Sequence, residues 1–462
     1  MSIRPSDGSC ATVHTHPMAI VDQKVPSDGL LRLLHSKALP PLLNNLLPKS
    51  TIRRRFREPK YTEHRTGGSA LVLGEGWCLD CIIIEVSLAG IYIHIPFCKQ
   101  ACHYCDFHFS VNTARKAEMV AAIGREIQLQ QGYLGQEVVN TIYLGGGTPS
   151  LLSEQELATI LAVCYQYFEV SPEVEVTLEA NPDDLSYEKL LAFRKIGINR
   201  LSIGIQSFHE PHLQYLNRAH SAKEAIRSIQ QAQELGFDNI SIDLIYAIPA
   251  PDHTIWESDL ATAMALRPQH ISSYALTIEE KTVFGRQQRR GVLSEVGENF
   301  TVAQFEQLLA TLDMHGYQQY EVSNFCRPGY ESKHNSNYWR RQPYLGVGPS
   351  AHSYDGKSRQ FNVANNGLYL KALSKNQLSF KHEVLSRPDQ INEYIMTGLR
   401  TQWGCDLNRM REEFDYDLYN HNQAYLRQLL AHQKAVIQKD HLILTKQGLL
   451  LADGIASDLF VS

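Results

Sequence analysis

Short apolar, β-branched runs alternate with stretches of helical periodicity over residues 90 to 279. The β-rich runs read GIYIHIP, TIYLGGGTPS, VEVTLEANP, RLSIGIQSF, NISIDLIYAIP and HISSYALTIE. Apolar residues recur at helical spacing between these runs, at 115–130, 153–168, 186–195, 222–235 and 256–266. Strands that alternate with helices predict βαβ units and a parallel sheet. At least six such units in succession predict a complete or partial β/α barrel, with its chemistry at the carboxyl ends of the strands.

The pattern changes in the second half of the chain. A helix at 300–316 is followed by a loop-rich stretch at 326–356, and we expect further helices at 389–400, 407–413 and 421–432. The sequence HLILTKQG then resembles the two-strand wing of a winged helix. Because it carries no strong basic stripe, we expect packing or protein contact there rather than DNA binding. The fold class we expect is α/β: a partial (β/α)6 barrel, a smaller α+β region and a C-terminal winged-helix-like domain.

The expected domain boundaries follow these changes. A core domain spans 88–325, an extension of it spans 326–382, and the C-terminal domain spans 383–462. Residues 1–87 show no periodicity, and we interpret them as a disordered tail or a non-native upstream extension, with Leu88 as the alternative start. Cys78 and Cys81 form a lone CxxC pair in that segment, which is weak evidence for a metal site.

Composition narrows the class of protein. The chain has 462 residues, of which 43% are hydrophobic and 20% charged, with a net charge of -5. These values are ordinary for a globular protein and argue against bulk binding of nucleic acid. The sequence shows neither a long apolar run nor the pattern of a signal peptide. Its nine cysteines are an odd number, which favours a reducing, cytoplasmic compartment and metal ligation over disulfides.

Three cysteines are clustered in CKQACHYCDF, directly after the first expected strand. Cys98, Cys102 and Cys105 supply thiolates that suit a soft metal centre. A structural zinc ion needs four ligands, and the fourth would come from His103, Asp106 or His108. A [4Fe–4S] cluster usually takes four cysteines, so three would leave one iron open to a substrate or cofactor. The spacing alone leaves both kinds of site open.

The CxxxCxxC spacing after a first strand, with aromatic Tyr104 before the third cysteine, resembles the radical S-adenosylmethionine (SAM) family. That resemblance implies a [4Fe–4S] cluster whose open iron is chelated by the amino and carboxylate groups of SAM, and it makes zinc the minor reading. GGGTP at 145–149 resembles the family's glycine motif for the SAM amino group. Taken alone, it would be a plain tight turn.

Polar residues at successive strand ends complete the resemblance. Such groups converge on a ligand in a barrel, although each one alone is more often a helix cap or a surface pair. The SAM-binding residues that the resemblance implies are Tyr92, Tyr104, Gly146, Gly147, Thr148, Glu179, Gln206, Arg218, Asp243 and Ala275.

A narrower resemblance covers about residues 90 to 460. YIHIPFC, GGGTP, NPDDL, GIQSF, NRAH and IDLIYAIP together resemble the oxygen-independent coproporphyrinogen III oxidase group, including its C-terminal domain. The oxidase branch has a fourth cysteine where this chain has Phe107, and its specific N-terminal segment is not recognisable in residues 1–87. Both departures speak against the decarboxylase activity of that branch.

The motif HNSNYW is instead similar to the haem chaperone branch of the group, the HemW type, as is YLGVGPSAHSY after it. The resemblance implies haem binding by His334, Asn335, Tyr338 and Trp339. A neutral imidazole is a common haem ligand and aromatic rings suit a porphyrin face. The axial ligand stays open, with Cys326 and His352 also nearby in the sequence. The alternative is a loop in which the His334 and Asn335 side chains bond the backbone and Trp339 belongs to the core.

The function implied is that of a haem chaperone that binds haem, a [4Fe–4S] cluster and SAM. It would deliver haem to haem-requiring membrane proteins such as respiratory enzymes, from the cytoplasm or from a peripheral position at the membrane. The resemblance is also compatible with a homodimer. The rival hypotheses are an oxygen-independent coproporphyrinogen III dehydrogenase, another radical SAM reaction and, more remotely, a structural zinc protein.

Overall fold

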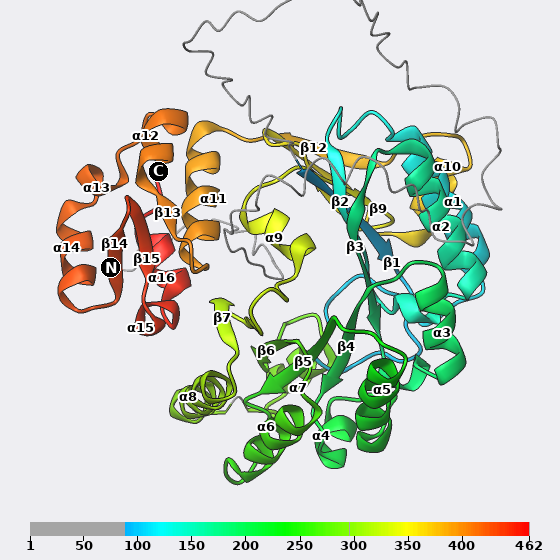
Figure 1. The fold of residues 1–462 in the computed structure, drawn as a ribbon, viewed down its shortest axis with the longest axis horizontal. Helices are drawn as coiled ribbons and strands as arrows, with labels where there is room; N and C mark the ends of the chain where they lie inside the picture. The colour runs from blue at the N-terminus through cyan, green and yellow to red at the C-terminus, as the bar shows by residue number, and fades with distance from the viewer. Residues whose placement is uncertain (1–87, 295, 462) are drawn as a thin grey trace, which may run out of the picture.

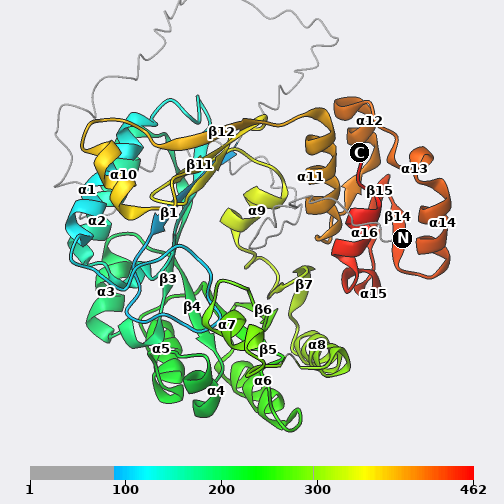
Figure 2. The same cartoon turned by 180° about the vertical axis from the view of Figure 1, so that it is seen from behind.

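A computed structural model describes residues 88–461 except residue 295. The interpretation of residues 1–87, with Cys78 and Cys81, therefore lies outside the described residues. Figure 1 shows an open, curved sheet with helices on its outer side and a smaller helical domain beside it, and Figure 2 gives the reverse view.

Twelve strands form one sheet, in the order β12-β11-β10-β9-β1-β2-β3-β4-β5-β6-β8-β7. Its centre consists of six parallel strands in chain order. They are β1 (Leu88–Ile95), β2 (Val138–Gly146), β3 (Val170–Ala180), β4 (Arg200–Gln206), β5 (Ile240–Tyr246) and β6 (His270–Ala275). Because β12 and β7 are its two free ends, the sheet is open, and the expected partial barrel is confirmed.

Within the described residues, six helices connect the parallel strands and cover their outer face, and two more follow β6, the last of these strands (Figure 1). They are α1 (Lys116–Leu129), α2 (Glu154–Tyr167), α3 (Tyr187–Lys195), α4 (Glu210–Tyr215), α5 (Ala222–Glu234), α6 (Thr254–Leu266), α7 (Val283–Arg289) and α8 (Glu298–Met314). Capping boxes fix the first turns of two of these helices. Ser153 and Glu156 form the one at the start of α2, and Ser221 and Glu224 form the one at the start of α5.

The two faces of each strand differ in polarity. In β4, Leu201, Ile203 and Ile205 are fully buried in the core between sheet and helices. The alternate residues, from Arg200 to Gln206, face the inside of the partial barrel and line a cavity there. Because side chains alternate along a strand, the sheet places an apolar layer outside and a polar layer inside.

Segment 318–384 extends the sheet at both ends. Its elements are β7 (Gln318–Glu321), β8 (Asn324–Cys326), α9 (Lys333–Trp339), β9 (Tyr344–Val347), β10 (His352–Tyr354), β11 (Ser358–Asn362), α10 (Asn366–Leu373) and β12 (Phe380–Val384). The expectation of a loop-rich stretch at 326–356 was wrong in part, because β9 pairs with β1 and HNSNYW forms helix α9. The elements are too short to show a period.

The C-terminal domain has its own three-stranded sheet, in the order β13-β15-β14, and its own apolar core. Its elements are α11 (Arg387–Leu399), β13 (Cys405–Asp406), α12 (Leu407–Phe414), α13 (Leu418–His421), α14 (Gln423–Ala431), β14 (Ala435–Gln438), β15 (His441–Leu444), α15 (Lys446–Leu449) and α16 (Ala452–Asp458). The expected two-strand wing in HLILTKQG was placed too late: only His441–Leu444 is a strand, β15, and it pairs with the preceding β14, whereas Lys446–Leu449 forms helix α15. The turn residues of the β14–β15 hairpin, Lys439 and Asp440, both have positive φ, as a tight hairpin turn requires.

Candidate functional site

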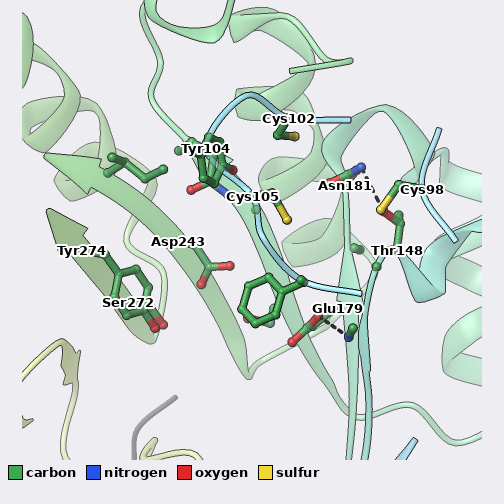
Figure 3. Close-up of a pocket in the computed structure, with 18 of the residues that line it drawn as sticks. Cys98, Cys102, Tyr104, Cys105, Thr148, Glu179, Asn181, Asp243, Ser272 and Tyr274 are labelled. Carbon is green, nitrogen blue, oxygen red and sulfur yellow. Dashed lines mark hydrogen bonds between the residues drawn. The ribbon is translucent and has the colours of Figure 1, made fainter. Parts of the chain in front are cut away.

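A cavity of about 350 Å³ opens at the inner face of the sheet. Figure 3 shows its wall, formed by the loop after β1 and by the inward side chains of β3, β5 and β6. Residues of β2, β4 and the start of α9 complete the lining. The cavity therefore lies where a β/α barrel carries its ligand.

The three clustered cysteines border this cavity from the β1–α1 loop. All three are free and half-buried. Cys98 Sγ accepts a hydrogen bond from Thr148 Oγ1 at 3.5 Å, and Cys102 Sγ accepts one from Arg218 Nη1 at 3.3 Å. Donors that point at sulfur stabilise the thiolate form of a cysteine.

The cysteine arrangement fits a cluster better than a single ion. No three His, Cys, Asp or Glu side chains of the described chain surround one point closely enough to hold one metal ion. A [4Fe–4S] cluster does not need such convergence, because each thiolate binds a different iron. Burial raises the pKa of Cys98 to about 11 and that of Cys105 to about 12. A cationic centre is therefore needed to hold these thiols as thiolates.

Two of the possible fourth zinc ligands, His103 and His108, each make a hydrogen bond through one ring nitrogen. The His103 ring lies 3.1 Å from the Tyr215 carbonyl oxygen, and the Nε2 atom of His108 lies 2.8 Å from Asn366 Oδ1. Each contact uses one ring nitrogen, as in metal-binding histidines, so the choice between zinc and a cluster rests on the arrangement of the three cysteines.

The glycine motif forms a turn in close contact with β1. Gly146 ends β2 with φ +107°, a left-handed conformation that favours glycine. Its amide donates a 3.1 Å hydrogen bond to Glu179 Oε2, while the Tyr143 hydroxyl donates one of 2.7 Å to Oε1. Burial, strengthened by Asp243, raises the pKa of Glu179 to about 7. Glu179 thus ties the glycine turn of β2 to β3.

Arg218 connects the cysteine loop to the strand ends. Besides Cys102, its guanidinium donates to Asn181 Oδ1 at 2.7 Å and to the Gly204 carbonyl at 2.8 Å. Tyr104 Oη lies 3.4 Å from Nη1. Arg218 therefore holds the loop after β1 against the ends of β3 and β4.

Polar side chains of β4, β5 and β6 line the part of the cavity that these strands form. Asp243 of β5 lies beside Ser272 of β6 in Figure 3. Burial raises the pKa of Asp243 to about 6, opposed by a hydrogen bond with Ser272. Gln206, at the end of β4, has φ +68° although it is not glycine. Such strained residues cluster at ligand sites in proteins.

The structure brings nearly all of the expected SAM residues together. Those that line the cavity are Tyr104, Gly146, Gly147, Thr148, Glu179, Gln206, Arg218, Asp243 and Ala275. Tyr92 is not part of the lining. It lies one layer behind, with its ring stacked on Tyr143 at a centroid distance of 6.0 Å and its hydroxyl 3.2 Å from His94 Nδ1.

The HNSNYW motif is divided between the cavity and the protein interior. Asn335 lines the cavity, whereas His334 and Trp339 are 1% and 4% exposed. His334 Nδ1 lies 2.8 Å from Thr141 Oγ1 and Nε2 lies 3.0 Å from the Tyr338 hydroxyl. Burial lowers the pKa of His334 to about 3, so its ring is neutral and both nitrogens are engaged.

Trp339 lies at the other end of α9, in a small cluster with Tyr320 and Cys326. The guanidinium carbon of Arg400 lies 5.6 Å from its ring centroid. Trp339 is therefore part of a buried cluster, as the alternative proposed, whereas the His334 ring contacts the side chains of Thr141 and Tyr338 rather than the backbone. Of the other two residues considered as haem ligands, Cys326 is in this buried cluster and His352 is exposed on β10.

Several cavity residues were missed by the sequence reasoning. Tyr143, Asn181, Arg200, His270, Ser272 and Tyr274 all line the cavity. Asn181 directly follows LEA in LEANP, so a search for polar groups at strand ends could have found it. Arg200 and His270 begin their strands, and a search confined to carboxyl ends passes over them.

No helix of residues 88–461, as far as they are described, is both long and apolar enough to cross a membrane.

Comparison with known proteins adds to this geometry. Residues 92–259 match the model of the radical SAM superfamily, and residues 385–451 match the HemN C-terminal domain. Heme chaperone HemW of Bacillus subtilis is 35% identical over 374 residues, which cover 80% of this chain and 98% of that protein. The chain belongs to the HemW family. A second relative, radical S-adenosyl methionine domain-containing protein 1 of Bos taurus mitochondria, is 33% identical over 377 residues, 79% of this chain and 82% of its own.

Among solved structures, coproporphyrinogen III oxidase HemN of Escherichia coli matches with a TM-score of 0.71. The match covers 81% of this chain and 90% of that one at 21% identity, so it shows a shared fold. The radical SAM domain of this HemW-family chain implies a [4Fe–4S] cluster and SAM as its cofactors.

Proposed function

We propose that this protein is a haem chaperone that binds haem beside a SAM-ligated [4Fe–4S] cluster. The observation that carries the proposal is the 35% identity to Heme chaperone HemW of Bacillus subtilis over 98% of that protein. The half-buried cysteine cluster beside the cavity supports the cluster part of the proposal independently.

In this proposal Cys98, Cys102 and Cys105 hold three irons of the cluster. The Thr148 and Arg218 donors stabilise two of the thiolates. A reduced cluster of this kind supplies one electron to SAM when both are bound.

SAM would occupy the cavity. The glycine turn and Glu179 would hold its amino group, because an anionic carboxylate and close backbone atoms suit an ammonium ion. Asp243 would accept hydrogen bonds from the ribose hydroxyls, and Ala275 would border the adenine. Tyr104, Gln206 and Arg218 would close the pocket beside the cluster. Tyr92 would act from behind, by supporting Tyr143.

Haem would contact the wall that α9 forms. Asn335 is the residue of the HNSNYW motif that lines the cavity, whereas His334, Tyr338 and Trp339 fix the helix that carries it. Ligation of haem iron by His334 would take a buried ring nitrogen that is already hydrogen-bonded to Thr141 or Tyr338. We therefore propose contact through Asn335 with the other three residues in support.

Further proposals concern the partners of the protein. Haem would pass to haem-dependent membrane proteins such as respiratory enzymes, from the cytoplasm or from the membrane surface, and the chain would form a homodimer. Phe107 stands where the oxidase branch has a fourth cysteine, so we expect no decarboxylation of coproporphyrinogen III.

The test is an anaerobic haem titration of the full-length, cluster-reconstituted protein, followed by absorbance. Asn335→Ala should weaken haem binding by about tenfold, whereas Asn420→Ala, exposed on α13, should leave it unchanged. Absence of haem binding by folded, cluster-loaded wild-type protein would refute the chaperone. Vinyl products from coproporphyrinogen III and SAM would favour the oxidase instead.

A further inference from the structure

Arg200 is a buried cation at the inner end of the cavity. It begins β4, is 2% exposed and belongs to the cavity lining. Its Nη1 atom donates to Asn239 Oδ1, but its Nε atom has no hydrogen-bond partner among the described residues. Buried guanidinium groups are normally paired with anions, because an unpaired buried charge is costly. Arg200 is therefore incompletely satisfied by the protein alone.

Hydroxyl groups, a neutral imidazole and one buried carboxyl group lie near Arg200. Ser202 of β4 and Ser241 of β5 lie side by side in the sheet and contribute hydroxyl groups to the lining, and Ser272 and Tyr274 of β6 line the cavity further along. His270 is neutral there, since burial lowers its pKa well below the usual value, and its Nδ1 atom lies 2.7 Å from Ser241 Oγ. Asp243 is the nearby carboxyl group: burial raises its pKa to about 6, and hydrogen bonds with Ser272 and Ser202 and the charges of Arg218 and Arg200 oppose this rise.

This end of the cavity is separate from the cluster end. Arg218 bonds the Gly204 carbonyl, four residues further along β4 than Arg200. At the rise of a strand, about 3.3 Å per residue, backbone positions 200 and 204 lie roughly 13 Å apart. The Arg200 guanidinium is bonded to Asn239, and the Arg218 guanidinium to Cys102 and Asn181, so the two groups have different partners.

We propose that the inner end of the cavity is a subsite for a carboxylate, anchored by Arg200. One guanidinium with surrounding hydroxyl groups matches a single negative charge, and guanidinium geometry suits the two oxygens of a carboxylate. The carboxylate comes from a haem propionate, which rests on the proposed function, or from a small free acid. The competing interpretation is that Arg200 only braces the start of β4 through Asn239.

The test compares three probes on the full-length, cluster-reconstituted protein. Haem and haem dimethyl ester, whose propionates carry no charge, are titrated by absorbance. Succinate is added to haem-free protein, and the shift in melting temperature is measured. Wild type is compared with Arg200→Gln and Arg200→Lys, and Arg227→Gln, exposed on α5, is the matched control.

If a propionate occupies the subsite, wild type should bind haem about tenfold more tightly than the ester. Arg200→Gln should abolish this preference without changing the affinity for the ester, and Arg200→Lys should keep part of it. If a small acid occupies it, succinate should raise the melting temperature of wild type and not of Arg200→Gln, even should haem fail to bind at all.

The proposal is overturned if wild type shows neither a preference for haem over the ester nor stabilisation by succinate. That comparison needs no variant, so poor folding of Arg200→Gln does not prevent a decision. A loss of stability in Arg200→Gln with unchanged probe preferences would establish the bracing role instead.

Discussion

A methyl group placed on Gly146 would lie 2.6 Å from the Nδ1 atom of His94. The glycine turn of β2 thus lies directly against the imidazole ring of the neighbouring strand. His94 has little freedom to move, because its Nε2 atom is 2.8 Å from the His108 carbonyl oxygen and its Nδ1 atom contacts Tyr92. The turn keeps its shape only with glycine at this position.

Gly146→Ala should therefore lower SAM affinity by at least about tenfold, since both the clash and the positive φ distort the turn. Iron content should stay near wild type because the cysteines are on another loop. Gly132→Ala is the control, since its added methyl group would meet no atom within 4 Å. Equilibrium dialysis with labelled SAM measures the SAM affinity of both variants. Equal affinities would contradict the assignment of the glycine turn to the SAM site.

Cys102→Ala should abolish the [4Fe–4S] cluster. Two thiolates leave too few protein ligands to retain it, and the Arg218 donor loses its sulfur acceptor. The measurement is iron and sulfide content after anaerobic reconstitution. Cys164→Ala, in the outer core on α2, should keep wild-type content; full loading of the Cys102 variant would exclude this cysteine as a ligand.

The free energy of unfolding should decrease as the pH rises from 4.5 to about 7, because Glu126 keeps its proton over this interval only in the folded protein. Burial raises the pKa of this carboxyl from 4.5 to about 7, although Tyr369, Gly348 and Asn362 donate hydrogen bonds to it. Between pH 4.5 and about 7 the folded protein therefore binds one proton more than the unfolded chain. The resulting stabilisation, about 3 kcal/mol, is complete below pH 4.5 and is lost as pH rises to about 7.

Glu126→Gln should remove this contribution to the pH dependence, which urea unfolding at pH 5, 6, 7 and 8 would show. Glu306→Gln, exposed on α8, should retain the wild-type slope. Parallel slopes for wild type and Glu126→Gln would mean that Glu126 is ionised throughout.

His334→Ala and Asn335→Ala should separate folding from ligand binding. The His334 ring bonds Thr141 and Tyr338 and stacks on Tyr143 at 4.9 Å, so its removal should lower the free energy of unfolding by about 2–4 kcal/mol. Asn335→Ala should lower it by less than about 1 kcal/mol. Chemical denaturation measures both; a stable His334 variant that has lost haem absorbance would instead identify the ring as a ligand.

The parallel sheet was predictable because its strands carry long apolar runs and its helices show clear periodicity. Ile203 and Ile205 alternate with Gly204 and Gln206, and this period reveals both the core face and the cavity face of β4. The cysteine spacing likewise placed three ligands on one loop.

The features of the fold and of the site that could not be predicted depend on contacts between residues far apart in the sequence. Helix α9 is stabilised by Ser332 at its start and by Glu175, which accepts hydrogen bonds from the Lys333 and His334 amides across 158 and 159 residues. No local pattern contains that information. The burial of His334 and the unpartnered Nε of Arg200 are also properties of the assembled sheet, so sequence could not distinguish a packed ring from a ligand.

Helix α9 has one end fixed to the sheet through His334 and the other held against Arg400 of the C-terminal domain through Trp339. Asn335, between them, is part of the cavity wall. A ligand that displaces α9 would have to break the contacts of His334 with the sheet or those of Trp339 with Arg400. If a ligand moves α9, the free energy of ligand binding and that of packing the C-terminal domain against α9 are linked, and by reciprocity a partner that moves this domain would change ligand affinity by the same factor.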